Sequence, residues 1–302
     1  MVRDIALVLG GGGATGNAWL IGIIAGLAEA DCDMTEAADV VIGTSAGATA
    51  AAQMLSGIPP ADLLASVLSP PAQQVGQNRP RLPSLPMATV FERMRAIGAS
   101  AESAADLQRA MGAFGLESDA ILGPGAAQRR ATVAARLPCA EWPDRPMIVT
   151  AIDAHTGELV LFDRKSGADL VDAVSASTAL PGLLPTVGIN GGRYIDGGVR
   201  SADNADLASG YANVVVLSPL GGRGQTEPGQ FEGLRRAPEW RTDLASQVED
   251  LRAQGSRVEV ITPDVDSRAA MSRNQMDLAA RIPAARAGFA QGKREASRLT
   301  FS

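Results

Sequence analysis

The sequence contains little cysteine and histidine: of its 302 residues, two are cysteine and one is histidine. Cys32 and Cys139 lie far apart and form no C-x-x-C pair, so neither a zinc site nor a disulfide scaffold is indicated. We therefore expect a protein without a metal site, in a reducing compartment.

Positive charge is not in excess either. Acidic residues outnumber basic ones by 33 to 27, which gives a net charge of −6 and an isoelectric point of about 5.0. Proteins that bind nucleic acids or anionic lipid through charge carry a basic patch or stripe, and this balance gives no sign of one. We therefore expect no nucleic-acid partner, and nothing in the sequence specifies an oligomeric state.

Long apolar runs are also missing. No run approaches the ~18 apolar residues of a transmembrane helix. Near the N-terminus, the run from Ile5 to Leu9 is too short for the apolar region of a signal peptide and is followed by glycines instead of a cleavage site. We expect a soluble, cytoplasmic protein.

What the sequence does contain is a regular alternation of strands and helices in a globular composition, 46% hydrophobic. The alternation predicts a single domain over residues 1–302, a three-layer α/β sandwich with a mostly parallel central sheet. The predicted strands are 5–9, 40–42, 147–153, 158–163, 193–195, 214–217 and 258–261. The predicted helices of this core are 17–30, 43–56, 169–177, 202–209, 242–254 and 275–298.

The pattern changes between residues 58 and 146, where prolines cluster between modest helical stretches at 87–97, 104–114 and 125–137. We interpret residues 58–146 as a helical, proline-rich insertion that covers the site within the same domain. The clustered prolines are Pro59, Pro60, Pro70, Pro71, Pro80, Pro83 and Pro86.

The turn after the first predicted strand is rich in glycine. The run Gly11-Gly12-Gly13-Ala14-Thr15-Gly16 satisfies G-x-G-x-x-G between a strand and a helix, a fingerprint of dinucleotide binding. That function needs an acidic residue at the end of the second strand, where Gly43-Thr44-Ser45 stand, and a P-loop needs Lys and Ser or Thr where Asn17-Ala18 stand. Two other uses remain: a tight turn that serves packing, or an oxyanion hole built from exposed backbone N–H groups.

The second predicted strand leads into a nucleophile motif. Gly43-Thr44-Ser45-Ala46-Gly47 is G-x-S-x-G between a strand and a helix, the context in which serine becomes a nucleophile on a sharp turn. We expect Gly43 and Gly47 to be needed because the backbone crowds on both sides of the serine. The helix N-terminus would favour the alkoxide of Ser45. The alternative is a plain helix start capped by Thr44 or Ser45.

The base for Ser45 is a carboxylate by elimination. Histidine-dependent hydrolases of the α/β class place their histidine after the acid, and the single histidine, His155, lies in a predicted hairpin turn at 154–157. The best candidate is Asp196 in Asp196-Gly197-Gly198, at the end of a predicted strand, where the sites of open α/β sheets gather. A lone Asp-Gly is otherwise a common turn.

These three motifs, in this order, resemble the patatin-like phospholipases, which use a serine-aspartate dyad without histidine. The resemblance covers the first ~200 residues and includes the run 176–182 before the aspartate. It implies Ser45 as nucleophile, Asp196 as base, and the amides of Gly11, Gly12 and Gly13 as the oxyanion hole. It also implies hydrolysis of acyl esters in lipids without a metal ion or other cofactor, with transient contact with a membrane surface.

One position departs from the family. Many members carry Arg or Lys before the last glycine of the first motif, and Thr15 stands there instead. If that cation anchors phosphate, a neutral ester becomes a better substrate than a phospholipid. Leu63, Leu64, Val67 and the segment 82–87 are candidates for part of an acyl slot, with ordinary packing as the alternative.

Two other functions stay open from the sequence. One is a non-catalytic, lipid-binding relative that keeps the fold. The other is a nucleotide-binding oxidoreductase, which the glycine-rich turn alone would allow.

Overall fold

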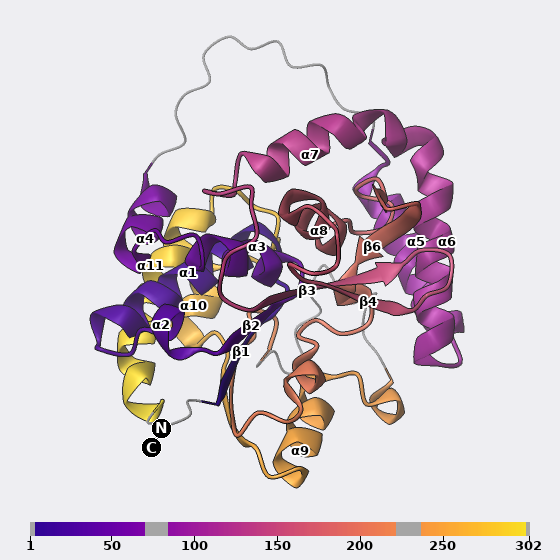
Figure 1. Ribbon diagram of the computed structural model, residues 1–302. Coiled ribbons are helices and arrows are strands. Elements are labelled where there is room, and N and C mark those ends of the chain that lie inside the picture. Colours follow the sequence, from indigo (N-terminus) through magenta and orange to yellow (C-terminus); the bar gives the residue numbers. More distant parts are fainter. Residues whose placement is uncertain (1–3, 70–83, 222–236, 300–302) are drawn as a thin grey trace.

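The structure is a computed structural model and describes residues 4–69, 84–221 and 237–299 (Figure 1). Within these ranges a sheet of eight strands has the order β5-β6-β3-β2-β1-β7-β8, with β4 also paired to β3. The strands are β1 (Ile5–Leu9), β2 (Val40–Gly43), β3 (Met147–Asp153), β4 (Leu159–Phe162), β5 (Val187–Ile189), β6 (Gly192–Asp196), β7 (Asn213–Leu217) and β8 (Arg257–Ile261).

The sheet combines a parallel part with an antiparallel part. Strands β8, β7, β1, β2 and β3 run parallel to one another, whereas β4 and β6 are antiparallel to β3, and β5 is antiparallel to β6. The prediction of a mostly parallel central sheet in an α/β fold is therefore confirmed.

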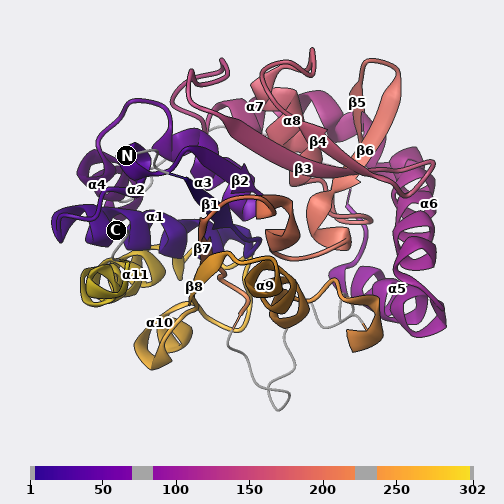
Figure 2. The same cartoon turned by 60° about the horizontal axis from the view of Figure 1, so that its bottom comes forward.

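Helices cover both faces of this sheet (Figure 2). One face packs on α1 (Gly13–Glu29), α3 (Ala46–Met54), α4 (Pro60–Leu68), α8 (Leu170–Ser177) and α11 (Arg281–Glu295). The other face packs on α9 (Leu244–Ala253) beside β7 and β8, and on α5 (Met87–Ser100) and α6 (Ala104–Leu122) beside β3 and β6. The remaining described α-helices are α2 (Met34–Ala37), α7 (Ala126–Ala134) and α10 (Val265–Ala270).

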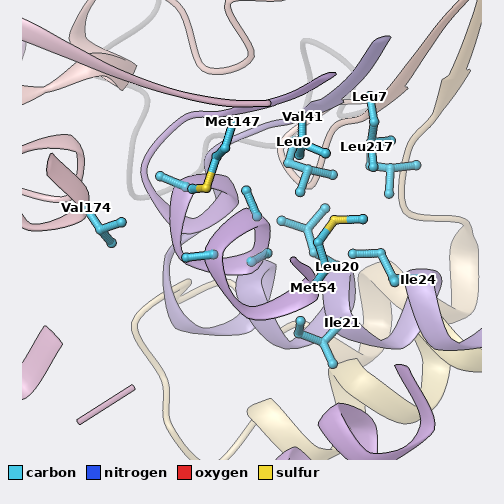
Figure 3. Close-up of a cluster of buried hydrophobic side chains, with 14 of the residues drawn as sticks. Leu7, Leu9, Leu20, Ile21, Ile24, Val41, Met54, Met147, Val174 and Leu217 are labelled. Atoms are coloured by element: carbon cyan, nitrogen blue, oxygen red, sulfur yellow. The ribbon is translucent and has the colours of Figure 1, made fainter. Parts of the chain in front are cut away.

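The position of β1 inside the sheet explains why its sequence is apolar throughout. Leu7 and Leu9 point to the face covered by α1 and α3, where Figure 3 shows them beside Leu20 and Ile24. Side chains alternate along a strand, so Ala6 and Val8 belong to the cluster on the opposite face. A strand covered on both faces has no solvated side, which makes a continuous apolar run necessary.

Several predicted elements differ from those observed. Helix α1 begins at Gly13 instead of residue 17, the predicted helix 202–209 is a short 3-10 turn at Ala205–Ala208, and the last helix begins only at Arg281. Strand β5, which holds Gly188, was not predicted because three residues give too little alternation to recognise. Periodic patterns fix the existence of elements better than their ends.

Residues 58–146, predicted as one helical insertion, contribute to two different hydrophobic clusters. The segment is helical, but α4 packs into the main cluster through Leu63, Leu64 and Val67, whereas α5 and α6 form a second cluster with β3 and β6. These three residues are core residues, which is the ordinary packing that the sequence left open as the alternative to an acyl slot. The prolines at 70, 71, 80 and 83 and part of the segment 82–87 lie outside the described residues.

None of the helices in the described ranges combines the length and the apolar character that crossing a membrane would require.

Candidate active site

Ser45 lies on a strained turn between β2 and α3. Its backbone angles are φ 54° and ψ −115°, in the region that non-glycine residues rarely adopt. The amide of Ser45 donates a hydrogen bond of 2.9 Å to the hydroxyl of Ser177, the last residue of α8. A bond from outside the turn therefore helps to hold the strained conformation.

The two motif glycines are required by close backbone approach. A Cβ atom at Gly43 would lie 2.5 Å from the Cα of Ala48, so the crowding expected around the serine is present there. A Cβ atom at Gly47 would lie 1.9 Å from the carbonyl oxygen of Leu9. The second glycine is thus required first by contact between α3 and the end of β1, and its carbonyl oxygen would lie 2.8 Å from a Cβ atom at Gly43.

Asp196 meets Ser45 through the register of three strands. Gly43 pairs with Val149 in the parallel pair β2-β3, and Ala151 pairs with Asp196 in the antiparallel pair β3-β6. Residue 196 is therefore level with residue 45, two positions beyond Gly43. We expected Asp196 at the carboxyl end of a parallel strand, where the sites of open α/β sheets gather, but β6 is antiparallel to β3. The register of the strands brings the two residues together instead.

The two side chains form a short, mostly buried contact. The hydroxyl of Ser45 donates a hydrogen bond of 2.8 Å to Oδ2 of Asp196, and Oδ1 of Asp196 accepts one of 2.7 Å from the amide of Gly198. The aspartate is only 4% exposed. A buried carboxylate that accepts a serine proton is the arrangement that general-base activation needs.

A buried asparagine, which sequence reasoning missed, joins the loops that carry both residues. Nδ2 of Asn204 donates to Oγ1 of Thr44 at 3.1 Å and to the carbonyl of Gly197 at 3.3 Å. Oγ1 of Thr44 also shares a hydrogen bond of 2.9 Å with Oγ1 of Thr150. Asn204 is fully buried and has φ 51°. Asparagine adopts a positive φ more readily than most residues, so the asparagine shortly after the D-G-G motif is the one signal that the sequence offered.

The glycine-rich turn passes directly beside Ser45, but its three amides are not equivalent. A Cβ atom at Gly11 would lie 3.5 Å from the Cβ of Ser45. The amide of Gly11 donates to the carbonyl of Ala202 at 2.7 Å. Among the described residues, nothing accepts from the amides of Gly12 and Gly13 at the start of α1.

The side chain at position 15 is not exposed, so it does not take the place of the cation that many family members carry there. Thr15 is fully buried, and its amide donates to the carbonyl of Gln275 at 3.0 Å. A positive charge lies near the dyad on α7, where Arg129 is close enough for the carboxylate of Asp196 to raise its pKa. Burial opposes this effect more strongly and lowers the pKa of Arg129 to about 10.

The single histidine lies apart from these residues. His155 is exposed in the turn between β3 and β4, where its amide donates to the carboxylate of Asp153 at 2.8 Å. The predicted hairpin and the position of His155 in its turn are confirmed. Over the described ranges, no group of three or more His, Cys, Asp or Glu side chains could hold a metal ion.

Comparison with known proteins gives one family and two structures. The family described as patatin-like phospholipase matches residues 7–209. VipD from Legionella pneumophila is 14% identical with a TM-score of 0.44, over 98% of this chain and 67% of that one. The type III effector protein ExoU is 17% identical with a TM-score of 0.36, over 95% of this chain and 53% of that one, so the chain spans about half the length of ExoU. A search of curated proteins finds no match.

Proposed function

We propose that this chain, which belongs to the patatin-like phospholipase family, hydrolyses acyl ester bonds in lipids with Ser45 as nucleophile and Asp196 as base. The observation that carries the proposal is the hydrogen bond of 2.8 Å from the Ser45 hydroxyl to the Asp196 carboxylate. Family membership supports a lipid hydrolase; the residues and their roles rest on this geometry.

Acylation begins when Asp196 takes the proton of the Ser45 hydroxyl as the oxygen attacks the ester carbonyl. The carbonyl oxygen becomes an oxyanion, which the amides of Gly12 and Gly13 stabilise as hydrogen-bond donors. When the tetrahedral intermediate collapses, Asp196 returns the proton to the leaving alcohol. Gly11 holds the turn in place through Ala202 and donates nothing to the oxyanion.

Deacylation repeats these steps with water. Asp196 removes a proton from a water molecule that attacks the acyl-Ser45 carbonyl, and the proton returns to the Ser45 oxygen as the fatty acid leaves. An aspartate is a weak base, so the product of proton transfer needs stabilisation. Helix α3 begins directly after Ser45, and its N-terminal dipole lowers the energy of the serine alkoxide.

The proposal extends to the setting of the enzyme. Its substrates are lipid acyl esters, which it reaches by transient contact with a membrane surface. We further propose one catalytic domain over residues 1–302, acting without a metal or other cofactor. Cys32 and Cys139 are both free thiols, which supports a reducing, cytoplasmic location.

A panel of esters tests the function. Purified protein is assayed on phospholipid, lysophospholipid and neutral esters of graded chain length, with Ser45→Ala as the test variant and Ser66→Ala as control. Ser66 is a serine of α4 whose hydroxyl donates to the carbonyl of Leu63 in the same helix. We expect Ser45→Ala to lose several orders of magnitude in kcat while Ser66→Ala keeps wild-type rates. If the wild-type protein hydrolyses none of the esters, the result would support a non-catalytic relative. Activity that survives in Ser45→Ala would end the proposal.

A further inference from the structure

The end of α8 contacts the backbones of both residues of the proposed dyad. Ser177 is the last residue of α8, and its hydroxyl accepts a hydrogen bond of 2.9 Å from the amide of Ser45. Two residues later, the carbonyl of Ala179 accepts one of 3.0 Å from the amide of Asp196. Three consecutive residues, 177–179, therefore hold two residues that are 151 positions apart in the sequence.

These two hydrogen bonds are shielded from water. Ser177 has no exposed area, Ala179 is 1% exposed and Asp196 is 4% exposed. Water has little access to compete for the donors and acceptors, and a buried backbone amide without an acceptor is unfavourable. Each bond therefore favours one position of the backbone that it holds.

The amide of Ser45 has a particular need for its acceptor. Ser45 is the N-cap of α3, and the first amides of a helix have no carbonyl partner within their own helix. Its φ of 54° and ψ of −115° are of the kind that costs about 1–3 kcal/mol and persists only where surrounding contacts hold it. Without the hydroxyl of Ser177, the turn is free to relax and to move the Ser45 oxygen away from Asp196.

The end of α8 is itself fixed by further contacts. Oγ1 of Thr178 donates to the carbonyl of Val174 at 2.8 Å and accepts from Nη2 of Arg129, on α7, at 2.8 Å. The helix packs on α7 and on strands β3 and β6 (Figure 1). A segment held in this way can impose a defined position on the residues that bond to it.

We propose that Ser177 is a positioning residue, whose hydroxyl aligns the Ser45 oxygen with the Asp196 carboxylate. The inference rests on the proposed function and adds to it a third side chain on which the rate depends. Ser177 bonds to the backbone of Ser45 and takes no part in proton transfer. It affects the rate because a misplacement of about 1 Å can slow a reaction about 100-fold.

A neighbouring serine provides a matched control. Ser175 is also on α8 and is 2% exposed, but its hydroxyl donates to the carbonyl of Val171 in the same helix at 2.6 Å. Ser175→Ala and Ser177→Ala thus each remove one buried hydroxyl from the same helix. The second change also removes the acceptor of the Ser45 amide.

The experiment uses the full chain and two measurements. Steady-state kinetics on the ester that wild type hydrolyses fastest give kcat and KM for wild type, Ser177→Ala, Ser177→Cys and Ser175→Ala. The labelling rate of a fluorophosphonate reports the reactivity of the Ser45 oxygen without a lipid substrate. Circular dichroism shows whether each variant folds. Ser177→Cys keeps a side chain of similar shape with a weaker acceptor, so it tests the position even if Ser177→Ala does not fold.

We expect Ser177→Ala to lower kcat and the labelling rate about tenfold or more, with KM within about twofold of wild type, because Ser177 contacts no substrate. Ser177→Cys should lose less than Ser177→Ala but more than Ser175→Ala, which should keep the wild-type kcat. A folded Ser177→Ala with wild-type kcat and labelling would overturn the inference. Equal losses in Ser177→Ala and Ser175→Ala would do the same, because they would reveal a general effect of helix stability. If Ser177→Ala does not fold, a wild-type kcat in Ser177→Cys overturns the inference.

The variant Ser45→Ala separates this inference from the proposed function. If Ser45→Ala keeps its activity, the dyad itself is wrong. If Ser45→Ala is inactive while Ser177→Ala is as active as wild type, the dyad stands and only the positioning role of Ser177 fails.

Discussion

At the scale of single residues, the site depends on side chains that form hydrogen bonds with the residues next to Ser45 and Asp196. Asn204 is the clearest case, because one buried amide group bonds both the residue before Ser45 and the residue after Asp196. It does not contact the reacting atoms and acts as a positioning residue. Its hydrogen bond from Nη1 of Arg200, at 2.7 Å, fixes the orientation of the amide.

We predict that Asn204→Gly lowers kcat more than it raises KM, because the nucleophile and the base lose their common tether. Glycine keeps the positive φ at this position, so the change tests the amide and not the backbone. Loss of the two hydrogen bonds that the amide donates to Thr44 and Gly197 should also cost about 1–3 kcal/mol of stability. Steady-state kinetics and thermal unfolding measure both effects. A variant that unfolds earlier but keeps its kcat would show a purely structural role.

At the scale of elements, the fold depends on one unusually close pair of helices. Helices α1 and α11 touch backbone to backbone: a Cβ atom at Gly22 would lie 2.2 Å from the carbonyl oxygen of Ala285, and one at Gly288 would lie 2.5 Å from that of Trp19. Helix α1 follows the glycine-rich turn, so this contact sets the position of the proposed oxyanion donors.

We predict that Gly288→Ala destabilises the protein by about 1–3 kcal/mol, because the methyl group forces the two helices apart. Gly123→Ala is the matched control, because the added Cβ atom would lie 4.0 Å from the Cβ atom of Asp119. Thermal or urea unfolding of the two variants measures the difference. Equal stability of both would mean that the helices separate without cost, contrary to the packing seen here.

Much of the site could be predicted from the sequence, since Ser45 and Asp196 lie in local motifs whose glycines report tight backbone. What could not be predicted are contacts between distant segments. Ser177 is 132 residues from Ser45, and Thr150 is 106 residues from Thr44. The engaged amide of Gly11 likewise depends on Ala202, which no spacing in the first motif reveals. Apolar periodicity predicted most strands of the sheet but not the short strand β5.

At the scale of the whole molecule, the chain beyond the family match completes the fold. The match ends at residue 209, yet β7 pairs with the whole of β1, from Ile5 to Leu9, and α11 packs along α1. Residues after the match therefore pair with the central strand β1 and pack on α1, the helix that begins at the glycine-rich turn.

We predict that a fragment ending at residue 209 does not fold into an active protein, because β1 would become an exposed apolar edge and α1 would lose its partner. The measurement compares circular dichroism, solubility and ester hydrolysis of the fragment with those of the full chain. A fragment that unfolds cooperatively and hydrolyses esters would contradict the proposal of one domain over residues 1–302.

The identity of the base is tested most directly by mapping the covalent adduct of a fluorophosphonate in wild type, Ser45→Ala, Asp196→Asn and His155→Ala. Asparagine keeps the shape of the aspartate but accepts no proton, so the account predicts an adduct on the Ser45 peptide in wild type and His155→Ala. It predicts none in Ser45→Ala and labelling slower by orders of magnitude in Asp196→Asn. An adduct on Ser45 that forms normally in Asp196→Asn but is lost in His155→Ala would contradict the serine-aspartate dyad.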